Sequence, residues 1–500
     1  MVRKLLLAAA ALVLLLCAGG VALGAWVWDR TSVSTVGKVE FTNPLAIPPL
    51  APSRVDEQGR RVFELRAQTG TRDFGRGRTV TWGFNGDYLG PTLRATRGEQ
   101  VVVNVHNALN ETTTVHWHGM HLPARMDGGP HQPIRPGATW SPTWRVDQPA
   151  ATLWYHPHPH GQTEKHVYRG LAGMFILDDP ATGGRDLPDE YGVDDIPVIV
   201  QDKRFTRDGQ FHTGRRFFND LGILGDTLLV NGTVGPYLDV RTERIRLRLL
   251  NGSTARVYDF GFADGRSFAL VGTDGGLLAA PHTTARVTLA PGERAEIVVT
   301  VRPGERTVLR GFPPAGVDRF VGGADEFDVL QLRAADTLKA SPPVPARLVD
   351  VPRLDPADAA QTRAFRMSGH RINGRAMDMG RIDVVITRDT VEVWDVVNAH
   401  GTPHSFHVHD VQFQVLQVDG HEPPPHLRGW KDTVFLSPGT RMRIIARFAD
   451  YADPAMPYMY HCHMLYHEDN GMMGQFVVVA PGQRPQLPSG GAGQDHHHHD

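Results

Sequence analysis

Three local features recur in the same order along this 500-residue chain, and they constrain its fold more than any other pattern. Each copy has an Asn-Gly pair, a β-rich run ending on asparagine, and a Pro-Gly pair that leads into another β-rich run. Such pairs are turn signals, because glycine tolerates a positive φ. Three ordered copies predict an all-β protein of three consecutive β-sandwich domains. The Asn-Gly pairs begin at Asn85, Asn231 and Asn373, the runs end at Asn107, Asn251 and Asn398, and the Pro-Gly pairs begin at Pro136, Pro291 and Pro438.

The repeats place the three domains at residues 36–182, 190–336 and 362–482. A stretch rich in Pro, Ala and Asp at 337–361 is the predicted linker between the second and third domains. The tail at 483–500 is rich in Gly, Pro and Ser and contains a run of histidines, and we predict that it is disordered.

The N-terminus, residues 1–35, has a basic start followed by an apolar run from Leu5 to Trp28. This pattern is typical of a signal peptide, and the run is also long enough to remain as an uncleaved membrane anchor. Either alternative predicts export, so the folded body is periplasmic, secreted or held on the outer face of a membrane. Cys462 is the only cysteine outside this segment, which excludes an intrachain disulfide in the body and favours a ligand role.

Histidine is the unusual component of the composition, with 25 residues, whereas the net charge of −2 gives no electrostatic reason to expect a nucleic-acid partner. Four well-placed His-x-His pairs stand out, where random placement gives on the order of one such pair in the chain. On a strand such a pair points both imidazoles to one face. Two pairs lie in the first domain and two in the third, so eight imidazoles converge if these domains meet, and could hold three metal ions. The pairs are His116/His118, His156/His158, His407/His409 and His461/His463.

The second domain has only His212 and His282, far apart, and we predict that it is structural. Cys462 stands between His461 and His463, so on a strand the thiol and the two imidazoles face opposite sides. One short segment would then touch two metal sites. A set of His404, Cys462, His467 and Met472 has the composition of a blue-copper electron-transfer site. The alternative, histidines that bind no metal, could explain any single pair but explains the whole set poorly.

Four motifs carry a family resemblance: H-x-H-G at 116–119, H-x-H at 156–158, H-x-x-H-x-H at 404–409 and H-C-H-x-x-x-H-x-x-x-x-M at 461–472. With them the chain resembles the multicopper oxidases, the family of laccases, bilirubin oxidase and bacterial copper-efflux oxidases, over roughly 36–482. The resemblance implies cupredoxin-like Greek-key domains and four copper ions. It assigns type 1 copper to His404, Cys462, His467 and Met472, and type 2 copper to His116 and His407. It assigns one ion of the type 3 pair to His118, His156 and His463, and the other ion to His158, His409 and His461. It places His160 behind the ligands.

The resemblance also implies the reaction, in which a small reducing substrate gives electrons to type 1 copper and dioxygen is reduced to water. Electrons would pass through Cys462 to His461 and His463. Acids at two matching positions, Glu468 and Asp127, would assist proton delivery; the alternatives are a solvated surface acid or a turn former.

The substrate is less constrained. The chain lacks the long Met-rich insertion of the copper-efflux oxidases, and it has His400 and Thr402 where that family has an acid and a Met. We therefore predict a monomeric, laccase-type oxidase of phenols and aromatic amines, with cuprous, ferrous or manganous ions as alternative substrates. The segment Trp430 to Thr433 resembles a family segment near the type 1 site. A non-catalytic relative of the bacterial cell-division type and a copper nitrite reductase are alternatives, which the complete ligand set and the four His-x-His pairs disfavour.

Overall fold

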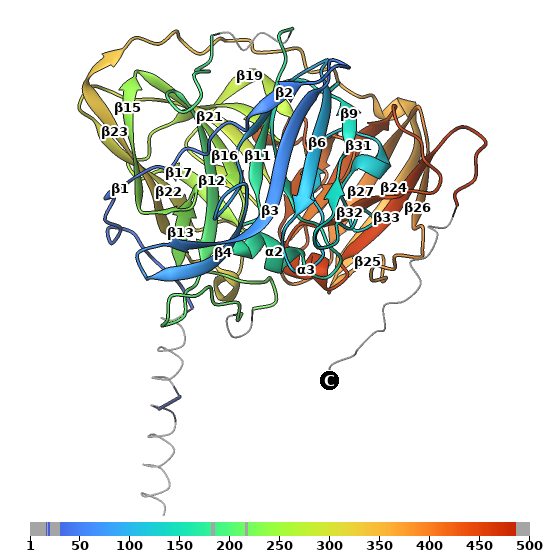
Figure 1. Cartoon of the computed structure of the whole chain (residues 1–500), viewed down its shortest axis with the longest axis horizontal. Coiled ribbons are helices and arrows are strands. Elements are labelled where there is room, and N and C mark those ends of the chain that lie inside the picture. Colours follow the sequence, from blue (N-terminus) through green and yellow to red (C-terminus); the bar gives the residue numbers. More distant parts are fainter. Residues whose placement is uncertain (1–16, 18, 21–30, 182–185, 216–218, 487–500) are drawn as a thin grey trace, which may run out of the picture.

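A computed structural model describes residues 17, 19–20, 31–181, 186–215 and 219–486. Its strands form six sheets, two in each of three successive sandwiches, which run in Figure 1 from blue through green and yellow to red. The prediction of an all-β fold with three consecutive sandwiches is therefore confirmed. Most of the predicted signal or anchor segment and most of the predicted disordered tail lie outside the described residues. Within the described part, no helix has the length and apolar character needed to span a bilayer.

The first sandwich packs a six-stranded sheet on a four-stranded sheet. The six-stranded sheet contains β2 (Ser53–Val55), β3 (Arg61–Asp73), β4 (Arg78–Phe84), β6 (Gln100–Asn107), β8 (Thr139–Trp140) and β9 (Thr143–Arg145). The four-stranded sheet contains β5 (Leu93–Thr96), β7 (His116–His118), β10 (Ala151–His156) and β11 (Gly173–Asp178).

The second sandwich pairs a seven-stranded sheet with a six-stranded sheet that also takes in β1 (Asn43–Pro44). The seven-stranded sheet contains β12 (Asp195–Lys203), β13 (Thr227–Val230), β14 (Thr233–Val234), β16 (Arg244–Asn251), β18 (Phe268–Thr273), β19 (Gly276–Thr284) and β21 (Arg294–Thr300). The other contains β15 (Pro236–Thr242), β17 (Tyr258–Phe262), β20 (Val287–Leu289), β22 (Arg306–Phe312) and β23 (Phe327–Lys339).

The third sandwich has two five-stranded sheets. One contains β24 (Ala359–Ser368), β25 (Arg371–Ile372), β27 (Thr390–Asn398), β29 (Phe413–Val418) and β31 (Arg441–Phe448), and the other contains β26 (Val384–Thr387), β28 (His404–Val408), β30 (Thr433–Leu436), β32 (Tyr458–Cys462) and β33 (Met473–Val479). Helices are short: α2 (Thr163–Arg169), α3 (Leu465–Asp469) and the 3-10 turns Ala124–Met126, Arg319–Val321, Pro356–Asp358 and Pro425–Leu427. Helices α2 and α3 lie side by side between the first and third sandwiches (Figure 1).

The threefold repeat extends to individual hydrogen bonds. Asn85, Asn231 and Asn373 all have positive φ, between 50° and 58°. The side-chain oxygen of each accepts a backbone N–H, from Arg66, Ile199 and Arg366 respectively. The side-chain amide of each donates to the carbonyl two residues before that donor, which belongs to Glu64, Pro197 and Ala364 respectively. Each asparagine that ends a β-rich run also donates to a carbonyl four or five residues later, and its own carbonyl accepts the N–H of the glycine in the following Pro-Gly turn. The same local chemistry thus builds each sandwich.

Strand pairing explains how each sandwich presents its histidines. In the first, β7 and β10 are antiparallel neighbours, so His116 stands opposite His156. In the third, β28 and β32 are antiparallel neighbours, so His407 stands opposite His461. Each sandwich therefore gathers its two His-x-His segments at one place, and the edges meet where Tyr458 donates a hydrogen bond of 2.7 Å to the carbonyl of Leu122.

Candidate metal centre

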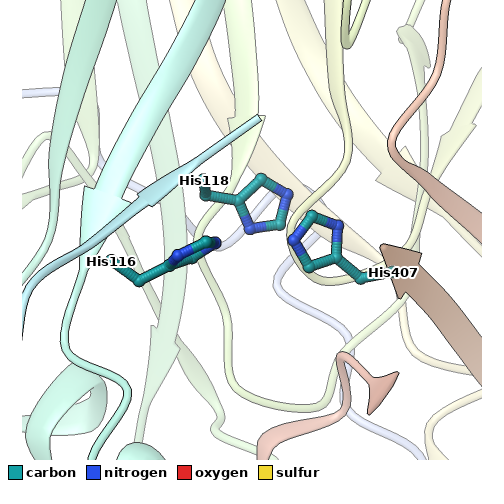
Figure 2. Close-up of side chains that lie close together, drawn as sticks. All are labelled: His116, His118 and His407. Carbon is teal, nitrogen blue, oxygen red and sulfur yellow. The ribbon is translucent and has the colours of Figure 1, made fainter. Parts of the chain in front are cut away.

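Eight imidazoles converge between the first and third sandwiches, each at most 1% exposed. Their ligand atoms fall into three groups, within each of which all atoms lie within 4.8 Å of one another. Rings from the two sandwiches stack in pairs, His118 on His407 at 3.7 Å and His116 on His409 at 3.8 Å between centroids. Figure 2 shows His116 and His118 on one strand turned towards His407. The groups are His116, His118 and His407; His118, His156 and His463; and His158, His409 and His461.

Oxygen acceptors fix the orientation of these rings. Nδ1 of His116 donates to the carbonyl of Asp127 at 3.0 Å, Nδ1 of His156 to that of Pro157 at 2.8 Å, and Nδ1 of His407 to that of Asp432 at 2.9 Å. A ring that donates through one nitrogen leaves the lone pair of the other available to a metal. Among the described residues, Nε2 of His116, Nε2 of His407 and both ring nitrogens of His463 are buried without a hydrogen-bond partner.

Buried polar atoms without partners need an explanation, and a bound cation supplies one. Nε2 of His461 lies 3.2 Å from Nε2 of both His158 and His409, so three nitrogens point at one spot. Burial lowers the pKa of His118, His156, His407 and His463 well below the ordinary value, and neighbouring imidazoles lower it further, so these four rings are neutral. Neutral imidazole is the form that binds metal.

Cys462 belongs to a separate group with His404 and His467. Its Sγ lies 3.6 Å from Nδ1 of His404 and 3.5 Å from Nδ1 of His467, and these two nitrogens are 3.0 Å apart. Met472 is buried in the same apolar core, and its carbonyl accepts the N–H of Cys462. Burial raises the pKa of the Cys462 thiol to about 12, so it becomes a thiolate only when a cation displaces the proton. A thiolate, two imidazoles and a nearby thioether suit copper.

The segment around Cys462 reaches both places. Side chains alternate at the end of β32, so His461 joins His158 and His409, His463 joins His118 and His156, and Cys462 faces away from both. Cys462 is joined by peptide bonds to His461 and His463, so the backbone links the cysteine group directly to the eight-histidine group.

The two acids contact cluster histidines and are buried. Oε1 of Glu468 lies 3.3 Å from Nδ1 of His158, and Oε2 lies 3.2 Å from Nδ1 of His461. Oδ2 of Asp127 lies 2.8 Å from Nδ1 of His409. Burial alone would raise the pKa of Glu468, but the two imidazoles outweigh it and lower the pKa below its ordinary value. Neither acid is a solvated surface residue.

The second sandwich also reaches the site, through contacts that the sequence analysis missed. Gly292 has φ +87°, and a Cβ there would lie 3.0 Å from Nδ1 of His463. The carbonyl of Asp220 accepts a hydrogen bond of 2.9 Å from Nε2 of His467. In the sequence, only the Pro-Gly turn at Pro291 and Gly292 marked a position that takes part in these contacts. His160 is exposed, and His160, His212 and His282 are outside the groups formed by the described residues.

One expectation about placement is wrong. Asp432, in the segment expected beside the type 1 ligands, contacts the eight-histidine group instead: its Oδ1 lies 3.0 Å from Nε2 of His118. Asp432 immediately precedes β30. The end of β30 next to Asp432 pairs with His407, whereas the far end pairs with His404.

Comparison with known proteins identifies the family. The multicopper oxidase family models match residues 66–182, 210–307 and 345–482. The chain is 37% identical to "Multicopper oxidase mco" of Staphylococcus haemolyticus over 87% of this chain and 93% of that protein. It is 36% identical to "Cell division protein FtsP" of Dickeya dadantii over 93% and 97% of the two chains.

Solved structures agree with this assignment. A laccase from Pediococcus acidilactici has a TM-score of 0.81 at 35% identity, covering 88% of this chain and 94% of that chain. A Campylobacter jejuni multicopper oxidase, described as a metallo-oxidase, has a TM-score of 0.78 at 25% identity, covering 90% and 98%. The chain belongs to the multicopper oxidases. Its domains are cupredoxin-like, and membership of this family implies that it binds copper.

Proposed function

We propose that this chain oxidises phenols and aromatic amines one electron at a time and reduces dioxygen to water. Cys462 would receive the electrons, and His461 and His463 would carry them onward. The observation that supports this most strongly is that one segment, 461–463, contributes to both groups of candidate ligands. Bound copper would supply the one-electron redox chemistry and the reduction of oxygen.

We assign four proposed copper sites to these groups of side chains. His404, Cys462, His467 and Met472 would hold type 1 copper. His116 and His407 would hold type 2 copper, and the remaining groups, His118, His156 and His463 with His158, His409 and His461, would hold the type 3 pair. The converging unpaired nitrogens and the buried thiol support this assignment. The completeness of the set favours an oxidase over a purely non-catalytic role. A role in cell division, which the name of the FtsP relatives states, is not needed to explain it.

The protein's own part in the reaction is to orient ligands, exclude water and hold protons. Burial of all eight imidazoles keeps bulk water from the site. Glu468 and Asp127 each contact cluster histidines, so they are placed to relay protons to the position where oxygen would be reduced. We also propose that the chain is exported by its N-terminal apolar segment, which would anchor it if uncleaved, and acts as a monomer.

A proton role for Glu468 predicts a defect in turnover without a defect in metal binding. Glu468→Gln keeps the side-chain volume but cannot exchange a proton, so we expect oxygen consumption to fall about 100-fold. Copper content and blue absorption should stay as in the wild type. Glu422→Gln, at an 88% exposed side chain in the same sandwich, is the control and should leave turnover unchanged. Unchanged turnover of fully loaded Glu468→Gln protein would remove the proton role.

Metal ions are the second candidate substrate, supported by the similarity to the C. jejuni metallo-oxidase. Against them, the ring next to His404 is that of His400, stacked at 5.4 Å, where a carboxylate or thioether would suit a metal ion better. A panel of diphenols with cuprous, ferrous and manganous ions, followed by oxygen consumption, separates the two. We expect kcat/KM for the diphenols to be at least about tenfold higher than kcat/KM for each metal ion. The reverse order would make the chain a metallo-oxidase.

A further inference from the structure

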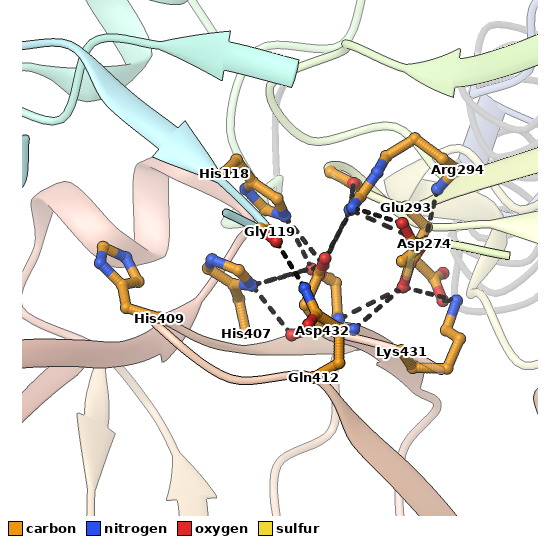
Figure 3. Close-up of polar contacts among 12 residues, drawn as sticks. His118, Gly119, Asp274, Glu293, Arg294, His407, His409, Gln412, Lys431 and Asp432 are labelled. Atoms are coloured by element: carbon orange, nitrogen blue, oxygen red, sulfur yellow. Dashed lines mark hydrogen bonds and ion pairs between the residues drawn. The ribbon is translucent and has the colours of Figure 1, made fainter. Parts of the chain in front are cut away.

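Asp432 contacts two histidines of the eight-histidine group, one from each sandwich. Its carboxylate accepts a hydrogen bond from Nε2 of His118 at 3.0 Å, and its carbonyl accepts one from Nδ1 of His407 at 2.9 Å (Figure 3). His118 therefore turns Nδ1 towards the centre, where it lies 3.4 Å from Nε2 of His156. His407 turns the opposite nitrogen, Nε2, inward. Together with the Thr433 hydroxyl, which lies 3.1 Å from Nε2 of His118 and 3.0 Å from Nδ1 of His407, Asp432 determines which nitrogen each of the two stacked rings presents.

The second sandwich holds Asp432 in place through Arg294 of β21. The Arg294 side chain is fully buried, and all five of its N–H groups donate. Two go to the Asp432 carboxylate as a fork, at 2.7 and 2.6 Å. The others go to the carbonyls of Thr152, Gly292 and Asp274. This one guanidinium joins all three sandwiches, and lysine, with three donors and no planar fork, could not replace it.

Further charges surround this pair. The Lys431 ammonium lies 2.8 Å from a carboxylate oxygen of both Asp274 and Glu293 (Figure 3). Three carboxylates and two cationic side chains are thus buried together beside His118. There is no room for a side chain on the residue after His118, because a Cβ on Gly119 would lie 2.5 Å from Oδ2 of Asp432.

We propose that Arg294 and Asp432 are positioning residues of the copper cluster, through which the second sandwich sets the ring nitrogens that His118 and His407 present. The inference rests on the proposed copper function. It gives the second sandwich, which has no His-x-His pair, a part in assembling the site. Partners that orient metal ligands in this way typically contribute about 10- to 100-fold to metal affinity.

Arg294→Lys tests this proposal against a matched control, Arg248→Lys. Arg248 is also a buried arginine of the second sandwich with a forked carboxylate partner, Asp195, and it also contacts Thr152, through the hydroxyl. Both variants remove a buried fork and should lower the melting temperature. Only Arg294→Lys should weaken copper binding at the cluster, by about 10- to 100-fold in a chelator-buffered titration. Its type 2 electron paramagnetic resonance signal should change while the blue absorption from Cys462 stays.

The outcomes separate the two proposals. Wild-type protein that binds no blue copper would overturn the proposed function itself. Wild-type protein that loads normally, with Arg294→Lys loading equally well and showing the same type 2 signal, would overturn the positioning role alone. Asp432→Asn decides the matter if Arg294→Lys does not fold. The new amide would place an N–H group opposite one of the N–H groups that Arg294 donates to the Asp432 carboxylate, and two donors cannot pair. We therefore expect the same loss of cluster copper. Normal copper loading would contradict the proposal.

Discussion

Replacing Cys462 with serine should abolish the blue absorption and substrate oxidation together. The thiolate is the one strongly covalent soft ligand of the candidate type 1 site, and a hydroxyl at that position cannot take its place. We expect kcat/KM for a diphenol to fall at least about 100-fold. The imidazoles of the eight-histidine group are unchanged in this variant, so copper should still bind there. The measurements are the visible spectrum, copper per chain by atomic absorption, and oxygen consumption.

Cys17→Ser is the matched control, since Cys17 is the only other cysteine of the chain and lies in the N-terminal segment. It should keep both colour and activity. Persistence of the blue band in Cys462→Ser protein would show that another residue supplies the charge-transfer ligand, and the proposed assignment of the type 1 site would be wrong.

Removing copper should lower the melting temperature substantially. The eight candidate ligands come equally from the first and third sandwiches, so bound metal cross-links the two. A ligand that binds only the native state adds ~4 kcal/mol per site when its free concentration is about 1,000 times its Kd. Several such sites should raise the unfolding midpoint by on the order of 10 °C. Differential scanning calorimetry of chelator-treated and reloaded protein measures this shift.

Magnesium is the control cation for that experiment. It prefers oxygen ligands in octahedral geometry, so it should not stabilise a site made of imidazoles. If apoprotein and copper-loaded protein melted together, the two sandwiches would not be joined through metal. Equal stabilisation by magnesium would point to a general effect of divalent cations.

Much of the fold could be predicted because its signals are local. An Asn-Gly turn, a strand-ending asparagine and a Pro-Gly turn each require particular residue types at adjacent positions, so they leave a pattern that repeats with the domain. The convergence of histidines was also predictable, because alternation along a strand places His461 and His463 on one face. The structure groups His461 with His158, and His463 with His118. Alternation along the strand did not specify these partners.

The support around the histidines could not be predicted in this way. Arg294 and Asp432 are 138 residues apart. Arg294 belongs to no repeated pattern or ligand motif, and the family segment that contains Asp432 pointed to the type 1 site instead. A buried arginine in a strand has no distinguishing sequence, because its role depends on which carboxylate another sandwich brings to it. The same holds for Gly292, whose contact with His463 exists only once the second and third sandwiches have packed together.

The most direct test of the account is the absorption spectrum of copper-loaded wild-type protein, recorded together with its copper content. The account predicts an intense blue band from the Cys462 thiolate and a near-ultraviolet shoulder from a bridged copper pair, with about four copper ions per chain. Protein that takes up copper and stays colourless would contradict the claim that segment 461–463 joins a blue-copper site to a copper cluster.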